Sequence, residues 1–477
     1  MPLLKARSNV LLSNSFFIFI IRFFPSLANL LVLILYSRQL SQNDYGNYQH
    51  FWIQLYIIYP LICMGIHVLL VTYSADFILG LFRQLTRLHI GLYILWALTL
   101  SGVFAFLQQT ALHISLYVPF LFMLSFSLSV VLETFLIVFR AYKSLVTISI
   151  IYSAAYFFIH FYILTHGFSL QAVYSLLLII TILRFCIYAV MTVVHISRTG
   201  FHHAPDGVEL KKARSLWLHL GFYDVTQNIF NWIDKFIISL VMTASVSAVY
   251  FNGSQNIPFL PLLLSAAGSA VLMQLASSDK ENEPKGIVYL MNQSGKVLSG
   301  IVFPVFFFLF LFRHELIGIL LLKYNAAIPV FAVFLLVLPV RAYSFTTVLQ
   351  RMHKGNIINA GSVGDIVLAC ALVYPLYRLF GLPGVALSFV ITTYLQAAFY
   401  LYYSARLLRV SPLKMIPYAN WAVKLIAFGI LFTIVHFIGN LYFNSRITLF
   451  LGAMTMAVLV IGSLYVDLKS MKNGNTQ

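Results

Sequence analysis

Charged residues are scarce in this chain of 477 residues. Asp, Glu, Lys and Arg together make up 9% of it, whereas a soluble protein carries about 25%. Cysteine is scarce as well, because Cys63, Cys186 and Cys370 stand alone inside apolar runs. Isolated cysteines exclude a disulfide framework and a CxxC metal site. No polar stretch exceeds roughly twenty residues, which leaves no room for a soluble domain.

Motifs of catalysis are also missing from the chain. There is no P-loop, no HExxH, no GxSxG and no acid pair in a soluble loop, so we expect neither an enzyme nor a nucleotide-driven pump. His202 and His203 are adjacent in a polar loop, where a solvated pair is expected rather than a metal site. We therefore predict no metal and no cofactor, apart from a coupling ion.

The net charge is +17, from 30 Lys and Arg against 13 Asp and Glu. In a soluble protein this excess would indicate nucleic-acid binding. In a chain this apolar, the positive-inside bias and contact with anionic lipid headgroups explain it, and an anionic substrate is the alternative. We expect membrane lipids, and no nucleic acid, among the partners.

Hydrophobic residues, by contrast, make up 61% of the chain. Apolar runs alternate with short polar breaks, and they predict an all-α polytopic membrane protein with about 14 transmembrane helices. The predicted spans are 11–36, 49–72, 86–107, 114–139, 145–165, 169–196, 215–242, 250–275, 289–312, 326–349, 358–377, 384–403, 420–439 and 447–466.

The distribution of basic residues predicts the topology. With a cytoplasmic N-terminus, nineteen of the 30 Lys and Arg residues fall in cytoplasmic loops and five in outer loops. Cytoplasmic loops of membrane proteins carry such an excess, so both termini are expected in the cytoplasm. Lys296 and Lys424 fall in the first turns of spans, where we expect their side chains to snorkel to the membrane surface.

The segment from Trp217 to Thr243 is long enough to cross a membrane, yet it is unusually polar. At about 100° per residue, its polar side chains fall on one face of a helix. These side chains are Asp224, Asn228, Asn231 and Lys235, with Asp234 at the margin. Such a helix is stable in a membrane only if this face borders protein or a water-filled cavity.

The first span carries a similar polar stripe, which includes Arg22, Ser26 and Asn29. A shift of 202 residues places Arg22 on Asp224 and Asn29 on Asn231. One stripe therefore matches the other after six spans, which predicts two parallel six-helix repeats, an architecture of transporters. We expect an N-terminal lobe at 1–197, a cytoplasmic linker at 198–214, a C-terminal lobe at 215–405, and two further spans with a cytoplasmic tail at 406–477.

Two segments beside these stripes resemble a known family. LYSRQLSQNDYGNYQHF (35–51) resembles the end of the first span of polysaccharide-biosynthesis flippases, where a loop with an acidic residue, Gly and Tyr leads into span two. NWIDKFIISLVMTASVSAVYFNGSQNI (231–257) resembles their seventh span, although Ala248 replaces a glycine of the repeat. The chain is thus similar to oligosaccharide-lipid flippases of the Wzx type, in the MOP superfamily with MATE exporters and the peptidoglycan-precursor flippase MurJ.

The resemblance implies a fold and a function. The fold is two pseudo-symmetric six-helix lobes around a central cavity that opens alternately to either side, plus two C-terminal helices. The function is translocation of an isoprenoid-diphosphate-linked oligosaccharide, such as an O-antigen, capsule or exopolysaccharide unit, across the inner (cytoplasmic) membrane of a bacterium. Glycan polymerases or glycosyltransferases would be its protein partners. No motif in the sequence selects a particular sugar.

Charged residues inside spans are the candidate site residues, because an unpaired charge at the bilayer centre costs roughly 2.5–3.5 kcal/mol. Cations of both lobes are expected to bind the diphosphate, whose oxygens suit the Arg fork and the Lys ammonium group. The expected cavity residues are Arg22, Arg184, Lys235, Arg341, Asn29, Asn228 and Asn231. The candidates for coupling to H⁺ or Na⁺ are Asp224, Asp234, Glu133 and Asp365. The alternative is that these cations and acids are structural partners of one another.

Aromatic residues make up 16% of the chain. We expect them in interfacial belts that face lipid, rather than in a platform that stacks sugars. Histidines in or near the spans, such as His67 and His436, are expected to be packed or hydrogen-bonded inside the protein.

Two other functions compete with the flippase. A MATE-like, cation-coupled multidrug exporter would need a cavity dominated by acids, whereas bases inside these spans are at least as numerous as acids. A membrane glycan polymerase would need a sizeable outer loop for catalysis, and the predicted outer loops are short.

Overall fold

The computed structural model describes residues 2–73, 75–167, 169–199, 207–255, 284–352 and 354–474. Within these ranges the chain is helical and has no β-strand, and 11 of its helices are long and apolar enough to cross a membrane. The predicted all-α polytopic membrane protein is therefore confirmed.

The count of 14 spans stays a prediction. The predicted spans at 49–72 and 215–242 are not among these 11, and the first is interrupted at Met64 and Gly65. The predicted span at 250–275 lies mostly outside the described residues.

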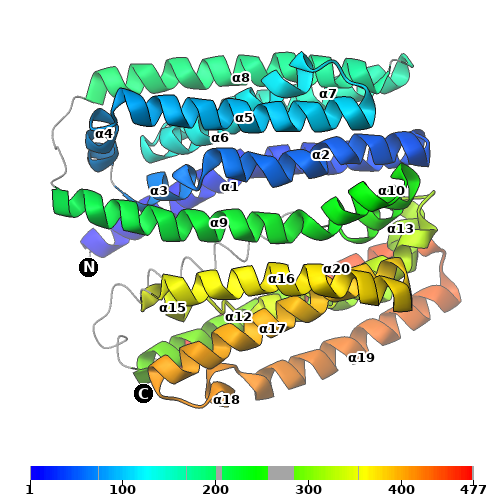
Figure 1. The fold of residues 1–477 in the computed structure, drawn as a ribbon. Coiled ribbons are helices and arrows are strands. Elements are labelled where there is room, and N and C mark those ends of the chain that lie inside the picture. Colours follow the sequence, from blue (N-terminus) through cyan, green and yellow to red (C-terminus); the bar gives the residue numbers. More distant parts are fainter. Residues whose placement is uncertain are drawn as a thin grey trace. The chain divides into compact units, whose positions relative to one another are not determined.

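Contacts within the chain divide it into two compact units, Met1–Ser245 and Val246–Gln477. The described part of the first unit contains nine helices, and a short tenth helix crosses the boundary between the units (Figure 1). They are α1 (Pro2–Gln39), α2 (Gln42–Cys63), α3 (Ile66–Thr72), α4 (Ala75–Arg83), α5 (Arg87–Leu112), α6 (Tyr117–Val138), α7 (Tyr142–Thr165), α8 (Leu170–Thr199) and α9 (Gly207–Val241), with α10 (Ala244–Gly253) at the boundary.

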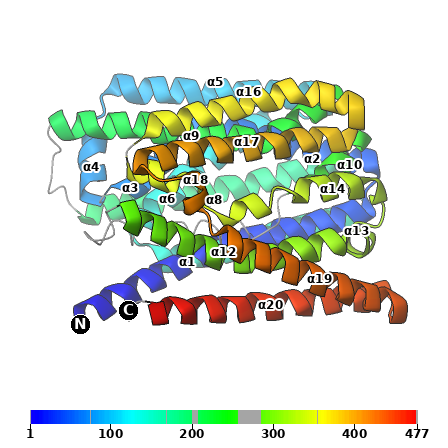
Figure 2. The ribbon, with the colours of Figure 1, turned by 90° about the horizontal axis from the view of Figure 1, so that it is seen from below.

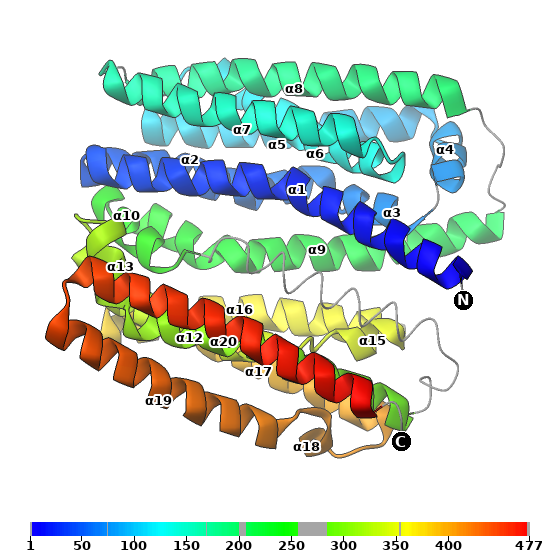
Figure 3. The same cartoon turned by 180° about the vertical axis from the view of Figure 1, so that it is seen from behind.

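Small polar side chains let the helices of the first unit approach closely. The helix α1 packs along α7 (Figure 3), where the hydroxyl of Ser149 donates a hydrogen bond to the carbonyl of Ile21 at 2.6 Å. Ser149 and Ser153 are one turn apart on the buried face of α7. Small residues at this spacing are typical of helix pairs inside membranes, because they allow backbones to come together.

The helix α9 packs against α2 and α3, so the contact boundary falls after Ser245. Residues 207–214 of the predicted linker form the first two turns of α9. The predicted lobes at 1–197 and 215–405 stay a prediction, since packing of one helix does not define a repeat.

The second unit contains nine further described α-helices (Figure 2). They are α12 (Pro284–Leu311), α13 (Arg313–Leu320), α14 (Ile328–Leu335), α15 (Thr347–Arg351), α16 (Gly355–Phe380), α17 (Leu382–Leu408), α18 (Pro412–Met415), α19 (Tyr418–Tyr442) and α20 (Ser445–Gly474). The predicted span at 326–349 is interrupted, with a 3₁₀ turn at Pro339–Ala342 between α14 and α15. Proline explains the interruption, because its ring cannot continue an α-helix without a clash and a lost hydrogen bond.

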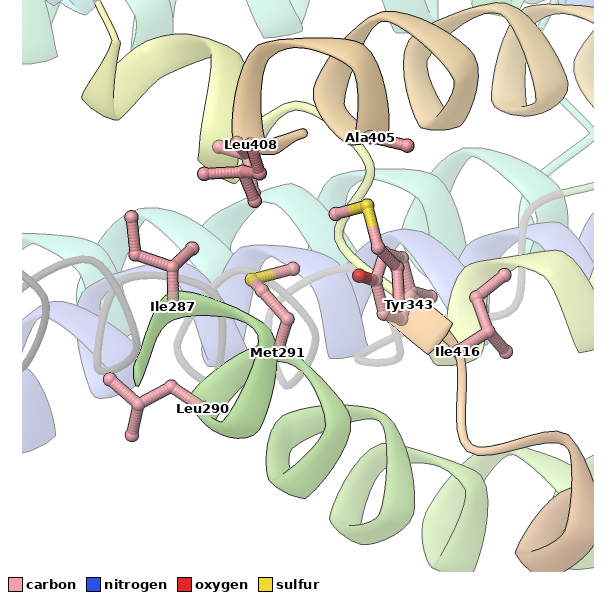
Figure 4. Close-up of a cluster of buried hydrophobic side chains, with 9 residues drawn as sticks. Ile287, Leu290, Met291, Tyr343, Ala405, Leu408 and Ile416 are labelled. Carbon is pink, nitrogen blue, oxygen red and sulfur yellow. The ribbon is translucent and has the colours of Figure 1, made fainter. Parts of the chain in front are cut away.

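A hydrophobic cluster joins α12, α15, α17 and α18 within the second unit (Figure 4). Met291 of α12 is 1% exposed, and Met415 of α18 is fully buried. The complete cluster is Ile287, Leu290, Met291, Tyr343, Val348, Ala405, Leu408, Met415 and Ile416. These apolar side chains fix the short helix α18 between α17 and α19.

A buried ion pair attaches the last two helices to α12. The ammonium group of Lys424 on α19 lies 2.7 Å from the carboxylate of Asp467 on α20. It also donates to the carbonyl of Lys296 on α12 at 2.6 Å. The expectation that Lys424 snorkels to the membrane surface is therefore wrong, because its charge is paired inside the protein.

Candidate functional site

The polar stripe of α9 meets a histidine from α3. The Nε2 atom of His67 lies 3.2 Å from a carboxylate oxygen of Asp224, and each side chain is about one-fifth exposed. His67 was expected to be packed or hydrogen-bonded, and the structure places it against a candidate coupling residue. Asp224 forms no ion pair with Arg22 among the described residues.

A break in the second predicted span positions His67. We expected one span at 49–72, but α2 ends at Cys63, and Met64 and Gly65 adopt left-handed backbone conformations before α3 begins. The carbonyls at the end of a helix have no partner within it, and lipid supplies none. Here the indole of Trp96 donates to the carbonyl of Leu61 at 3.0 Å, and the indole of Trp217 donates to that of Met64 at 2.8 Å.

Where the second span breaks, the backbone at Gly65 contacts the backbone of α9 at Gly221. Gly65 has a φ of +64°, and a Cβ atom added there would collide with the Cα atom of Gly221. We expect Gly65→Ala to lower the free energy of unfolding by about 2–4 kcal/mol, through the positive φ and through overpacking. Thermal unfolding of the purified protein in detergent measures this loss.

Gly167 provides a matched control for that variant. Its φ is +68°, but a Cβ atom there would meet nothing within 4 Å. Gly167→Ala should therefore cost only the penalty for positive φ, about 1 kcal/mol. Equal losses in the two variants would show that the contact between Gly65 and Gly221 does not constrain the break.

Arg22 of α1 lies near the same region. Its side chain is exposed, and both Arg22 and Asp224 are close enough to Tyr59 of α2 to interact with it electrostatically. Asn29, two turns further along α1, is exposed as well. The two stripes that the sequence predicts thus approach one tyrosine within the first unit.

Arg184 of α8 stacks on aromatic rings rather than on an acid. Its guanidinium carbon lies 4.2 Å from the ring centroid of Tyr152 and 5.6 Å from that of Phe126. Its Nε atom is buried without a hydrogen bond. Glu133 of α6 instead accepts a hydrogen bond from Tyr188 at 3.4 Å. In the described part of the chain, no carboxylate forms an ion pair with Arg184 or Arg22.

The other candidates on α9 make local contacts. Lys235 and Asp234 are adjacent, buried and paired, with 3.2 Å between the ammonium nitrogen and each carboxylate oxygen. Lys235 also donates to the carbonyl of Asn231 at 3.4 Å, and the amide of Asn228 donates to the carbonyl of Asp224 at 2.9 Å. These contacts fit the alternative in which Lys235 and Asp234 are structural partners.

Two candidates belong to the second unit. Arg341 lies in the 3₁₀ turn at Pro339–Ala342, and Asp365 is buried on α16 beside Thr392 of α17. The expected meeting of the four cations in one cavity stays a prediction, and so do the roles of all candidate residues.

Sequence reasoning missed the rings around Arg184 and Tyr59. We expected aromatic residues in lipid-facing belts, but Tyr56, Tyr59, Phe126, Tyr152 and Trp232 contact one another or Arg184 inside the first unit. The only signal in the sequence is the spacing of Tyr56 and Tyr59, one turn apart on one face of α2.

Comparison with solved structures identifies the fold. A lipid II flippase MurJ in an inward closed conformation superposes with a TM-score of 0.62 at 14% identity, over 96% of this chain and 99% of MurJ. A multidrug resistance MATE family transporter of the MOP superfamily gives 0.56 at 12% identity, over 81% and 94% of the two chains. The Vibrio cholerae MATE transporter VcmN gives 0.53 at 12% identity, over 84% and 98%.

The chain has the MurJ and MATE fold. The resemblance that 35–51 and 231–257 carry, to the superfamily of MurJ and the MATE exporters, is thereby confirmed at the level of the fold. It follows that this is a multi-pass membrane protein.

One curated relative adds a link to glycans. The chain is 25% identical over 258 residues to the "Probable low-salt glycan biosynthesis flippase Agl15" of Haloferax volcanii. The match covers 51% of this chain and 52% of Agl15, so it spans about half the length of either protein. No protein-family model matches the chain.

Proposed function

We propose that the chain is a flippase that moves an isoprenoid-diphosphate-linked oligosaccharide between membrane leaflets. The observation that carries the proposal is the pair of cations Arg22 and Arg184, which lie inside spans without an acidic partner in the described residues. Arg184 lies ~21 Å along α8 at ~1.5 Å per residue, well inside a bilayer core of ~30 Å.

An arginine at this depth costs several kcal/mol unless something neutralises it. Since no carboxylate among the described residues lies within ion-pair distance of Arg184, an anionic ligand is the natural partner. A diphosphate offers the paired oxygens that bind a guanidinium fork, and the isoprenoid tail stays in lipid. The names of MurJ and Agl15 support this class of substrate, because MurJ is titled a lipid II flippase and Agl15 a probable low-salt glycan biosynthesis flippase.

The remaining parts of the proposal come from the superfamily. Transport would follow alternating access, as in other transporters built from repeats. The membrane would be the cytoplasmic membrane with both termini inside, and glycan polymerases or glycosyltransferases would act beside the flippase. The solved neighbours are transporters by title, which gives no support to the alternative of a glycan polymerase.

A translocation assay tests the proposed function. The purified protein is placed in proteoliposomes together with polyprenyl-diphosphate-linked oligosaccharides. These lipids are extracted from the cells that naturally make the protein. We expect sugar on the inner leaflet to become accessible to a glycosidase added outside. Protein-free liposomes give the background, and a rate equal to that background would contradict the proposal.

A cation-coupled multidrug exporter is the second candidate. The observation that favours it is the MATE-like fold together with the acid Asp224, since MATE transporters share this fold at a TM-score of 0.56. Deletion of the gene would then sensitise cells to cationic drugs and leave surface glycan intact. The flippase predicts the reverse outcome.

Asp224 is the coupling residue that we propose to test, with His67 as its partner. Asp224→Asn should lower transport driven by a proton or sodium gradient by about tenfold, because a neutral amide has no negative charge to attract the cation and no titratable proton to exchange. The measurement compares proteoliposomes with and without an imposed gradient of each ion.

The matched control for this variant is Asp76→Asn, which removes an exposed carboxylate of α4 in the same unit. It should leave gradient-driven transport unchanged. If an ion gradient still stimulated transport by Asp224→Asn as strongly as transport by the wild type, Asp224 would not be the coupling residue. Asp234, Glu133 and Asp365 would then be the remaining candidates.

A further inference from the structure

We propose that an aromatic surface in the first unit binds the sugar rings of the substrate, next to the diphosphate. We call it the aromatic wall. It consists of Tyr56, Tyr59, Phe126, Tyr152 and Trp232. The inference deepens the proposed function and rests on it, because it assumes a lipid-linked oligosaccharide.

The rings of the wall form a continuous series across several helices. Trp232 of α9 stacks on Tyr56 of α2, with 4.6 Å between ring centroids and 19° between planes. One turn along α2, Tyr59 meets Tyr56 edge to face at 6.1 Å. Tyr59 in turn meets Phe126 of α6 edge to face at 5.6 Å. Helices far apart in the sequence thus contribute to one surface.

The series ends at a cation. The guanidinium carbon of Arg184 lies 5.6 Å from the ring centroid of Phe126 and 4.2 Å from that of Tyr152 on α7. The wall therefore runs from Arg184, which we propose binds the diphosphate, to Trp232, whose ring centroid lies 5.7 Å from the ammonium group of Lys235. The charge of Lys235 is already paired with Asp234. A glycan attached to a diphosphate has the same order, with the charge first and neutral rings after it.

The residues of the wall are more exposed than the aromatic residues that pack against them. All five residues of the wall and Arg184 are partly exposed. Their neighbours are buried, since Trp52 is 7% exposed, Phe122 1% and Tyr156 7%. On α2, only Tyr56 and Tyr59 between His50 and Pro60 are not buried. The wall is thus the more exposed side of a packed aromatic core, which holds the rings in place.

The wall offers the chemistry that a sugar requires. The C–H faces of a pyranose ring are apolar and stack on aromatic rings, while its hydroxyl groups need hydrogen-bonding partners. Among the described residues, neither Tyr56 nor Tyr59 has a hydrogen bond from its hydroxyl to the protein. A substrate that reached these hydroxyls would therefore not have to displace a protein partner. A cationic drug would also stack here, where Arg184 would repel it and Asp224 near Tyr59 would attract it.

Binding to the protein in nanodiscs tests the wall. The two probes are polyprenyl-diphosphate-linked oligosaccharides from the cells that make the protein, and polyprenyl diphosphate without sugar. We expect the wild type to prefer the glycosylated probe. Trp232→Ala should reduce that preference by about five- to tenfold and leave binding of the bare diphosphate unchanged.

Two further variants separate binding from folding. Trp232→Phe keeps a ring that can stack, so it should retain most of the preference even if Trp232→Ala folds poorly. Phe158→Ala removes a ring of α7 that is 64% exposed, and it should behave as the wild type does.

The outcomes distinguish this inference from the proposed function. If the wild type binds both probes equally and the variants change nothing, the wall is wrong and the flippase stands. If the wild type binds neither probe, the proposed function fails and the wall fails with it. If Trp232→Ala weakens the binding of ethidium but not the binding of the glycosylated probe, the wall belongs to a drug site and the inference is overturned.

Discussion

Arg184→Ala lowers transport of lipid-linked oligosaccharide by ~30-fold or more, because removing one partner of a buried charged contact costs at least ~2 kcal/mol. The guanidinium lies on the ring of Tyr152 with its Nε atom buried and unbonded, so the group is fixed in place before a ligand arrives. A diphosphate that loses this fork also loses its position along the aromatic wall.

Arg184→Lys refines the expectation. Lysine keeps the positive charge but has neither the planar fork nor the flat surface that stacks on tyrosine. We expect intermediate transport, between the wild type and Arg184→Ala. Initial rates in the proteoliposome assay measure all three.

The matched control is Arg378→Ala. Arg378 also stacks on a tyrosine, with its guanidinium carbon 5.4 Å from the ring centroid of Tyr374, but it is exposed at the last turn of α16. Transport should be unchanged in this variant. If Arg184→Ala and Arg22→Ala both leave transport intact, the two arginines do not bind the diphosphate.

Lys424→Met is expected to lower the free energy of unfolding by about 3–5 kcal/mol, because it leaves Asp467 charged and buried without its partner. Lys424 and Asp467 are each about one-tenth exposed, and Lys424 also bonds to the hydroxyl of Ser299 on α12 at 3.2 Å. The pair thus connects α12, α19 and α20. Thermal unfolding in detergent measures the loss.

The double variant Lys424→Met/Asp467→Leu is the control for that experiment. Replacing both charges by apolar groups of similar size removes the unpaired carboxylate, so much of the stability should return. A double variant as unstable as Lys424→Met would show that packing around Lys424, and not the ion pair, holds α19 and α20.

Much of the fold follows from local properties of the sequence. Whether a segment enters a membrane depends mainly on its own residues, so apolar runs such as 86–107 and 384–403 identify α5 and α17 without knowledge of their neighbours. The polar stripes on α1 and α9 also follow from helical spacing alone. Breaks within a span are harder to predict, because methionine rarely adopts a left-handed backbone conformation and nothing near Met64 indicates one.

Contacts between helices could not be predicted in this way. The residues His67 and Asp224 are far apart in the chain, as are Trp232 and Tyr56, and their meeting depends on which helix faces pack together. Lys424 was expected to snorkel because its own segment shows no acid, whereas its partner Asp467 comes from the next helix.

The sequence by itself determined that this is an all-helical membrane protein, and it located the 11 long apolar helices of the described residues. Hydropathy and helical period are sufficient for that, since each acts within one segment. Only the tertiary structure decided that Arg184 meets rings instead of an acid, and that five aromatic residues form one wall. Aromatic side chains are stable both in lipid and in a protein interior, so only the packing of the helices shows which environment a given ring occupies.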